Sequence, residues 1–258
     1  MADARAAKGG VERRISDGTP LLVVKGATIR FGGLVAVEGL DLVVRPGESV
    51  GLIGPNGAGK STVFNLIGGV YRPSAGSITL GGKDVGGLRP HRVVALGACR
   101  TFQNVRLFGG MTVLDNVRTA TLVRGRDAGT EGFCRALLDR FGLADRAGEL
   151  AGGLPYGAQR RLEIARALAT RPRLLLLDEP AAGMNPGEKD DLQARLRDVR
   201  DEAGVALLVI EHDMGFVMDL CGRVVVLDHG RKIAEGTPAQ VRADPAVIEA
   251  YLGPEDAS

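Results

Sequence analysis

Residues 54–62 of this chain read Gly-Pro-Asn-Gly-Ala-Gly-Lys-Ser-Thr, which fits the pattern G-x-x-x-x-G-K-[ST] at every fixed position. An apolar run at 49–53 comes directly before this loop, and residues 60–70 are compatible with a helix. Strand, loop and helix in this order point successive backbone N–H groups at phosphate oxygens, next to a helix N-terminus. The sequence therefore predicts a nucleoside triphosphate site formed by Gly54, Pro55, Asn56, Gly57, Ala58, Gly59, Lys60, Ser61 and Thr62.

Two side chains at the end of this loop have distinct expected roles. Lys60 places a cation against the β- and γ-phosphates, and the Ser61 hydroxyl can ligate Mg²⁺. A glycine-rich turn with an exposed lysine is the alternative interpretation. The flanking strand and helix favour the phosphate-binding loop over that turn.

A carboxylate pair, Asp178 and Glu179, follows the apolar run 174–177. Two carboxylates at the end of a buried strand suggest a specific role, because charged side chains are rarely buried without a partner. We expect Asp178 to hold Mg²⁺ through water and Glu179 to act as general base on the attacking water. A solvated pair that caps the next turn remains the structural alternative.

Two further polar residues, Gln103 and His212, are weak signals when each is taken alone. A lone Gln such as Gln103 is usually just a polar loop residue. His212 comes shortly after the apolar run 205–210, where a histidine at a strand end needs no further role. Their order relative to the phosphate loop and the carboxylate pair favours a hydrolytic site instead. We therefore predict that Gln103, Glu179 and His212 are its catalytic residues.

The rest of the chain alternates strand and helix patterns, which predicts an α/β fold. The run at 173–177 is continuously apolar after Arg173, and the run at 205–210 is apolar throughout, as in buried parallel sheets. β-rich runs at 21–31 and 40–44 precede the phosphate loop. Helical periodicity prevails between about 111 and 150, with Val113, Val117 and Leu122 expected on one helix. A hairpin is expected around the turn at 228–230.

Composition limits the classes of partner. The chain has 258 residues, a formal net charge of +2 and no Trp, which argues against nucleic-acid binding by charge or base stacking. Its three cysteines, Cys99, Cys134 and Cys221, show no metal-binding spacing and are expected to be reduced. The sequence shows no signal peptide and no apolar run near the ~20 residues that span a bilayer.

The ordered motifs together resemble the nucleotide-binding subunit of ATP-binding-cassette (ABC) transporters, over residues 21–253. Within that superfamily the sequence is most similar to ATPases of branched-chain (hydrophobic) amino acid importers. The stretches that carry the closer resemblance are 100–108, 160–166, 178–186, 210–214, 236–238 and 250–253. The resemblance implies a P-loop NTPase core of ABC type, with a β-rich N-terminal subdomain and an inserted α-helical subdomain. It also implies ATP and Mg²⁺ as cofactors.

The resemblance assigns further roles by position. Phe31 would stack on adenine, where many relatives use Tyr. Gln103 would approach Mg²⁺ and link the site to a membrane subunit, and His212 would contact the γ-phosphate. The signature loop at 154–158, including Tyr156 and Gly157, would precede a helix starting near Gln159. In a head-to-tail dimer, that helix end would face the nucleotide bound by the opposite subunit.

This signature loop departs from the commonest family motif, Leu-Ser-Gly-Gly-Gln. Pro155 stands at the Ser position and offers neither a hydroxyl nor an N–H group, so one γ-phosphate hydrogen bond is lost. Gly157 still allows close backbone approach. The activity of the site that this loop completes stays open, and a heterodimer with a second, similar ATPase would tolerate the asymmetry.

The expected organisation is a flexible extension at 1–20, an ABC ATPase domain at 21–253 with its helical subdomain inserted at about 104–170, and a tail at 254–258. Arg106, Leu107 and Phe108 would form a docking surface for a transmembrane permease; the alternative is that Leu107 and Phe108 only pack the insert onto the core. The expected location is peripheral, at the cytoplasmic face of the cell membrane.

The leading functional hypothesis is an ATPase subunit of a hydrophobic amino acid importer, working with permease subunits, a second ABC ATPase subunit and, indirectly, a solute-binding protein. A lipid or lipopolysaccharide exporter ATPase and a soluble ABC ATPase acting as an assembly scaffold are the alternatives. The cargo stays open among leucine-like amino acids, aromatic acids and urea-like solutes. The choice between homodimer and heterodimer stays open as well.

Overall fold

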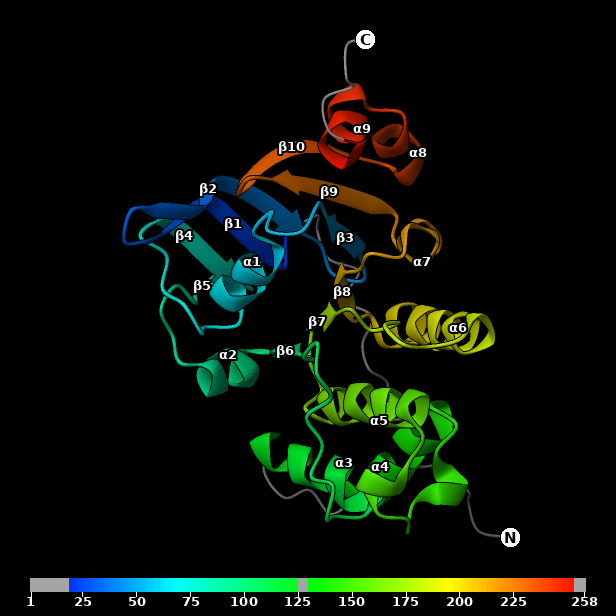
Figure 1. Cartoon of the computed structure of the whole chain (residues 1–258). Coiled ribbons are helices and arrows are strands. Elements are labelled where there is room, and N and C mark those ends of the chain that lie inside the picture. Colours follow the sequence, from blue (N-terminus) through cyan, green and yellow to red (C-terminus); the bar gives the residue numbers. More distant parts are fainter. Residues whose placement is uncertain (1–18, 125–129, 253–258) are drawn as a thin grey trace, which may run out of the picture.

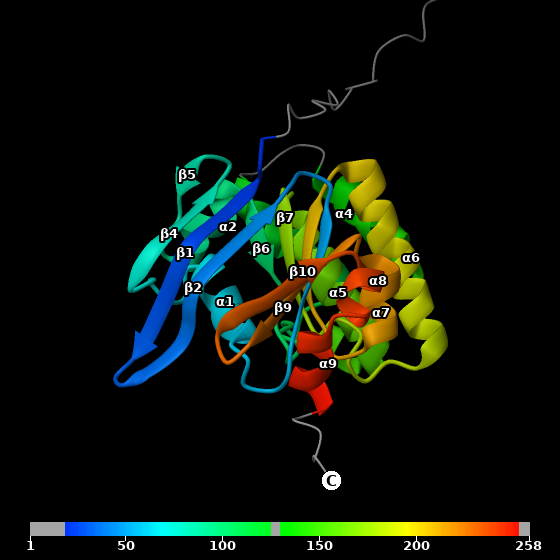
Figure 2. The same cartoon turned by 90° about the horizontal axis from the view of Figure 1, so that it is seen from above.

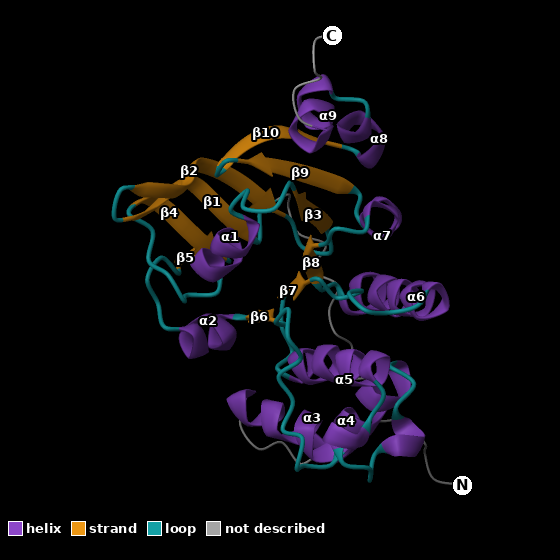
Figure 3. Ribbon diagram, viewed as in Figure 1, coloured by secondary structure: helices purple, strands orange, loops and turns teal. Residues whose placement is uncertain are grey.

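The protein is described by a computed structural model that covers residues 19–124 and 130–252 (Figure 1). The expected N-terminal extension, apart from residues 19 and 20, and the tail at 254–258 lie outside the described residues. Two sheets and an all-helical lobe make up the described part, as the secondary-structure colouring in Figure 3 shows. This is the α/β arrangement that the sequence predicts.

The main sheet contains six strands in the order β10-β9-β3-β8-β7-β6. All neighbours are parallel except the β9–β10 hairpin. Because β3, β7 and β8 run parallel, the residues that follow them meet at one edge of the sheet. The strands are β3 (Ser49–Ile53), β6 (Ala98–Arg100), β7 (Leu174–Asp178), β8 (Ala206–Ile210), β9 (Arg223–Asp228) and β10 (Arg231–Gly236).

Both faces of this sheet are buried. On β7, Leu175 and Leu177 pack into one hydrophobic cluster and Leu174 and Leu176 into another. The first cluster includes the helices α3 to α6, and the second includes α1 and the N-terminal sheet. A strand covered on both sides must be apolar throughout, which explains the unbroken leucine run.

The second sheet is antiparallel, with the order β2-β1-β4-β5, and lies beside the main sheet (Figure 2). Its strands are β1 (Leu22–Phe31), β2 (Leu34–Val44), β4 (Ala75–Leu80) and β5 (Lys83–Asp84). Helix α1 (Lys60–Ile67) follows the phosphate loop and buries Val63, Phe64, Leu66 and Ile67. Helix α2 (Pro90–Leu96) leads into β6.

The helical lobe contains α3 (Val113–Thr121), α4 (Thr130–Arg140) and α5 (Tyr156–Ala169), with single 3₁₀ turns at Leu122–Arg124, Ala144–Arg146 and Ala151–Gly153. Val113 and Val117 are buried, as their helical spacing predicts. Leu122, which the same periodicity places with them, is 58% exposed, because it lies in the turn after α3 ends.

The helices that follow β7 along the chain bury side chains in the first hydrophobic cluster, which they share with the helical lobe. Helix α6 (Pro186–Ala203) begins at a capping box, in which Asn185 and Glu188 bond each other's backbone N–H groups. It is followed by α7 (Met214–Leu220), α8 (Pro238–Arg242) and α9 (Pro245–Leu252). Within residues 19–124 and 130–252, no helix combines the length and apolarity that crossing a membrane requires.

Helix α5 begins three residues earlier than the sequence suggests. Pro155 is its N-cap, and Tyr156 and Gly157 already lie in its first turn. Proline is compatible with a helix start for two reasons. Its ring fixes φ, and the backbone N–H that it lacks would have no intrahelical acceptor at this position. Tyr156, Gly157 and Ala158 of the signature loop are therefore part of the helix, whereas Leu154 and Pro155 precede it.

Candidate functional site

A pocket of about 620 Å³ opens where the phosphate loop meets the ends of β7 and β8. It is lined by loop residues 56–62 together with Gln103, Glu179 and His212. Phe31 and residues 34–36 form another wall, and Phe31 makes an edge contact with Tyr71 at a ring-centroid distance of 5.1 Å. The structure thus brings together residues that lie up to 199 positions apart in the sequence, from Phe31 to Gly230.

Glycine is required at two points of the phosphate loop. Gly54 has φ +147°, and a Cβ there would lie 2.0 Å from the Leu227 carbonyl oxygen. Gly59 has φ +99°, and its Cβ would lie 2.6 Å from the Ala36 carbonyl oxygen. Both positions combine a left-handed backbone with direct backbone contact, so any side chain would displace the loop.

Lys60 is buried at the base of the pocket. Its ammonium group donates hydrogen bonds to the carbonyl oxygens of Gly54 at 2.6 Å and Pro55 at 2.9 Å. Burial lowers the pKa of Lys60, while the charges of Glu179 and Asp178 act in the opposite direction. The two carboxylates therefore help to keep the ammonium charged in a place where desolvation disfavours the charge.

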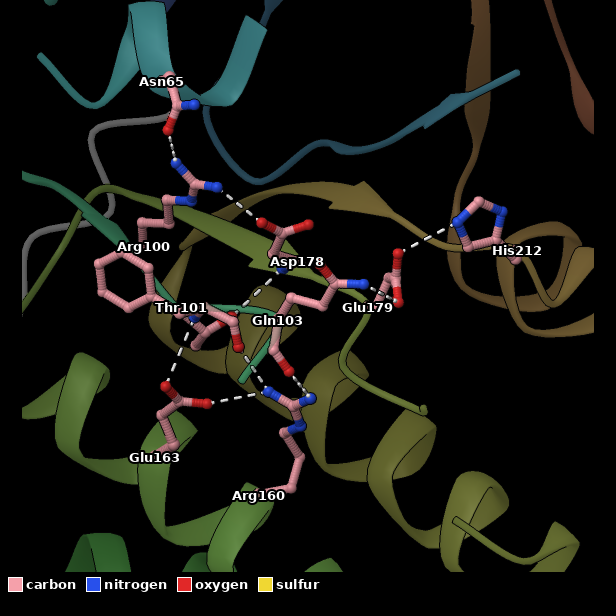
Figure 4. Close-up of polar contacts among 10 residues, drawn as sticks. Asn65, Arg100, Thr101, Gln103, Arg160, Glu163, Asp178, Glu179 and His212 are labelled. Atoms are coloured by element: carbon pink, nitrogen blue, oxygen red, sulfur yellow. Dashed lines mark hydrogen bonds and ion pairs between the residues drawn. The ribbon is translucent and has the colours of Figure 1, made fainter. Parts of the chain in front are cut away.

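Glu179 lies between the two residues that were weak signals in the sequence (Figure 4). Its Oε2 accepts a hydrogen bond from Gln103 Nε2 at 3.1 Å, and its Oε1 is 3.1 Å from His212 Nε2. Its backbone is left-handed, with φ +48°, and its N–H donates to the Ile210 carbonyl oxygen at 2.8 Å. A left-handed non-glycine residue is uncommon and costs energy, so the fold holds this carboxylate in a defined direction.

Asp178 lies one residue earlier, and its side chain is only 5% exposed. Its Oδ2 accepts from Arg100 Nη2 at 2.6 Å, and its backbone N–H donates to Thr101 Oγ1 at 3.2 Å. Arg100 was not among the site residues expected from the sequence. Asp178 is thus a paired, buried carboxylate and not the solvated strand-end group of the alternative interpretation.

The donors expected for Mg²⁺ are chemically suited to that ion. Ser61 offers a hydroxyl group, Gln103 an amide oxygen and Asp178 a carboxylate, and all three are hard oxygen ligands. The described residues hold no group of three or more His, Cys, Asp or Glu side chains that could bind a metal. A Mg²⁺ site at a nucleotide needs only a few protein ligands, because phosphates and waters complete the coordination of the ion.

Two predicted nucleotide-binding residues, Tyr156 and Gly157, do not line this pocket. Gly157 packs against Glu188, and a Cβ on it would lie 2.5 Å from Glu188 Oε1. Gly157 therefore lies against the capping-box side chain at the start of α6. Gly54 and Pro55 belong to the loop but also lie outside the pocket lining.

Sequence reasoning missed a buried ion pair on α5. Arg160 is fully buried and donates to the carbonyl oxygens of Phe102 at 2.7 Å and Gln103 at 2.6 Å. Its partner Glu163, at 3.0 Å, accepts from the backbone N–H groups of Phe102 and Arg106. Burial raises the pKa of Glu163, and Arg160 opposes that shift. The pair fastens the segment carrying Gln103 to the helical lobe (Figure 4).

We expect Arg160→Leu to lower the free energy of unfolding by about 3–5 kcal/mol, because it leaves Glu163 buried without its counter-charge. Urea denaturation measures the change. The control is Arg135→Leu on α4, whose exposed pair with Glu131 should contribute less than about 1 kcal/mol. Equal stability of the two variants would contradict a structural role for the buried pair.

The structure also places Glu211 and the β9–β10 turn at the site, which the sequence did not predict. Glu211 is buried, and its carboxylate accepts from the backbone N–H groups of Ala181 at 2.7 Å and His212 at 3.0 Å. It thereby joins the segment after Glu179 to the segment that carries His212. His229 and Gly230, in the predicted hairpin turn, line the pocket. In the sequence, only the position of Glu211, between an apolar strand and His212, could have indicated its role.

A second cavity, of about 970 Å³, is an apolar groove beside the helical lobe. Arg106, Leu107 and Phe108, the three residues of the predicted docking surface, are among those that line it. Leu107 is partly buried against the lobe, whereas Phe108 is 54% exposed and lies under the Arg166 guanidinium at 5.4 Å. Packing of the insert accounts for Leu107 but leaves Phe108 open to a partner.

Comparisons with known proteins agree with this geometry. Residues 37–182 match the "ABC transporter" family model, and residues 231–256 match the model described as "Branched-chain amino acid ATP-binding cassette transporter". The chain is 46% identical over 251 residues to the "High-affinity branched-chain amino acid transport ATP-binding protein BraF" of Pseudomonas aeruginosa, covering 91% of this chain and 98% of BraF.

Solved structures show the same fold. The ADP conformation of MJ1267, an ATP-binding cassette of an ABC transporter, superposes with a TM-score of 0.84 at 29% identity, covering 92% of this chain and 100% of MJ1267. A dimeric post-hydrolysis state of the cassette MJ0796, bound to ADP and Pi, gives 0.75 at 25% identity, covering 84% and 98%. These matches confirm the predicted fold class and the resemblance on which it rested. The chain belongs to the family of ABC transporter ATP-binding subunits.

Proposed function

We propose that this chain is the ATP-hydrolysing subunit of a membrane importer for branched-chain or other hydrophobic amino acids. The observation that carries the proposal is the position of Glu179, held between Gln103 and His212 in the pocket that the phosphate loop lines. The similarity to BraF over almost the whole of both chains and the match at 231–256 support import over lipid export or a soluble scaffold.

In this proposal, ATP binds with adenine on Phe31 and its phosphates in the loop at 54–62. Lys60 then exchanges its two carbonyl partners, Gly54 and Pro55, for β- and γ-phosphate oxygens. The ammonium group is already desolvated and fixed, so little reorganisation is needed when the phosphates arrive.

Mg²⁺ would be held by the Ser61 hydroxyl, with Gln103 and Asp178 reaching it directly or through water. The ion supplies charge neutralisation on the phosphate oxygens. Glu179 orients and deprotonates the attacking water, and its contacts with Gln103 and His212 fix the direction of its two oxygens. His212 is then placed to donate a hydrogen bond to the γ-phosphate.

The working form in this proposal is a head-to-tail dimer. Tyr156 and Gly157 lie outside the pocket of their own subunit, at the start of α5. In the dimer they face the nucleotide of the other subunit, and the segment 181–186 crosses the interface. ATP bridges the two halves and closes them, and hydrolysis allows them to separate.

ABC ATP-binding subunits work with transmembrane permeases, and we assign the groove at Arg106, Leu107 and Phe108 to that contact. The chain would then be a peripheral protein at the cytoplasmic face of the membrane, with a solute-binding protein as an indirect partner. We place the ATPase domain at 21–253 and its helical subdomain at about 104–170.

Reconstitution in proteoliposomes tests the proposed cargo class. The chain, its permease subunits and its ATPase partner are incorporated, the solute-binding protein is added outside, and uptake of radiolabelled leucine, isoleucine and valine is measured with ATP enclosed. We expect ATP-dependent uptake of at least one of them. Uptake of only aromatic acids or urea would overturn the cargo class, and ATP-driven lipid extraction would move the chain to the exporter class.

A further inference from the structure

Arg100, at the end of β6, contacts both Asn65 on α1 and Asp178 at the end of β7 (Figure 4). It ends β6, which pairs with β7 so that Arg100 lies opposite Leu176. Its Nη1 donates to Asn65 Oδ1 on α1 at 2.5 Å, and its Nη2 donates to Asp178 Oδ2 at 2.6 Å. One planar guanidinium thus joins the helix after the phosphate loop to the carboxylate proposed for Mg²⁺.

The position of Arg100 is fixed on its other sides. Its guanidinium carbon lies 5.4 Å from the ring centroids of both Phe64 and Phe102. Its side chain is 12% exposed and that of Asp178 is 5% exposed, so water screens the pair weakly. Because each Nη bonds a different residue, the guanidinium occupies only one oxygen of Asp178.

This arrangement has a consequence for metal binding. A cation at hydrogen-bond distance offsets the carboxylate charge that would attract Mg²⁺, and it also directs the second oxygen, Oδ1. We propose that Arg100 is a positioning residue for Asp178 and sets the Mg²⁺ concentration at which nucleotide binds. The inference rests on the proposed function, because it needs a nucleotide and Mg²⁺ in this pocket.

The same side chain also lines the groove assigned to the permease, next to Phe102 and Arg106. The carboxylate proposed for Mg²⁺ is therefore only one side chain away from that groove. The connection from the groove through Arg100 to Asp178 does not involve Gln103. The side chain of Gln103 donates to Glu179, and its carbonyl oxygen accepts from Arg160.

The test measures binding and not turnover. Mg²⁺ is titrated into the full chain with a fluorescent, non-hydrolysable ATP analogue, and the Mg²⁺ concentration at half-maximal binding is recorded. Arg100→Gln removes the competing charge, so we expect this midpoint to fall about tenfold, the effect of one charge-assisted hydrogen bond. The matched control is Arg200→Gln, which removes an arginine that pairs with a single aspartate, Asp201, and that does not line the nucleotide pocket; its midpoint should equal that of the wild type.

An unchanged or raised midpoint in Arg100→Gln, while the wild type binds the analogue normally, overturns the inference and leaves the proposed function intact. Failure of the wild type to bind the analogue overturns the proposed function itself. If Arg100→Gln does not fold, Asn65→Asp tests the same contact, because a carboxylate at 65 draws the guanidinium away from Asp178. Its midpoint should also fall, and an unchanged or raised midpoint in this variant would overturn the inference as well.

Discussion

Glu179→Gln is expected to slow ATP hydrolysis by about 10²–10⁴-fold, the usual contribution of a general base, while ATP binding is kept. Glutamine has almost the same shape but cannot accept the proton of the attacking water. The phosphate loop and Lys60 remain in place, so the variant should bind ATP and stay in the closed dimer. Phosphate release measures hydrolysis, and size-exclusion chromatography with ATP measures the dimer.

The control for this prediction is Glu202→Gln, which changes an exposed carboxylate at the far end of α6. Its hydrolysis rate should equal that of the wild type. If Glu179→Gln hydrolyses ATP at the wild-type rate, the general-base role is wrong. The contacts of Glu179 with Gln103 and His212 would then serve only to hold the loop.

Lys60→Ala is expected to weaken ATP binding by roughly 10- to 100-fold, because each charge-assisted hydrogen bond contributes about 1.5–3 kcal/mol. Lys60 is the buried cation at the base of the pocket, and its ammonium group already points at the loop carbonyls of Gly54 and Pro55. Isothermal titration calorimetry with ATP and Mg²⁺ measures the affinity.

Loss of Lys60 also removes the donors to those two carbonyls, so the loop itself could relax. Thermal unfolding without nucleotide separates a loosened loop from a lost phosphate contact. The control is Lys83→Ala, an exposed lysine on β5, for which the affinity should stay at the wild-type value. Undiminished ATP binding by Lys60→Ala would contradict the phosphate-loop assignment.

The strands β7 and β8 and the phosphate loop could be predicted because local sequence alone carries their signals. A strand buried on both faces is continuously apolar, and the glycines of the loop have no local alternative. The short elements α2 and β6 were not predicted. Strand β6 is only Ala98–Arg100, and its pairing with β7 depends on a strand more than 70 residues away along the chain.

The expected site residues Gln103, Glu179 and His212 lie together, whereas their supporting residues escaped the sequence analysis. Arg160 bonds the Gln103 carbonyl oxygen 57 residues away, and Arg100 bonds Asp178 78 residues away. Such contacts depend on how strands and helices pack, and a charged residue on a helix or strand looks solvent-exposed until that packing is known. The variants above test the proposed roles of Glu179, Lys60, Arg100 and Arg160.

The most direct test of the account is purification of the native complex in mild detergent, with its subunits identified by mass spectrometry. The account predicts two multi-span membrane proteins together with this chain and either a second copy of it or a second, similar ATPase. A complex that contains only soluble proteins would contradict the importer function and assign the groove at Phe108 to a different partner.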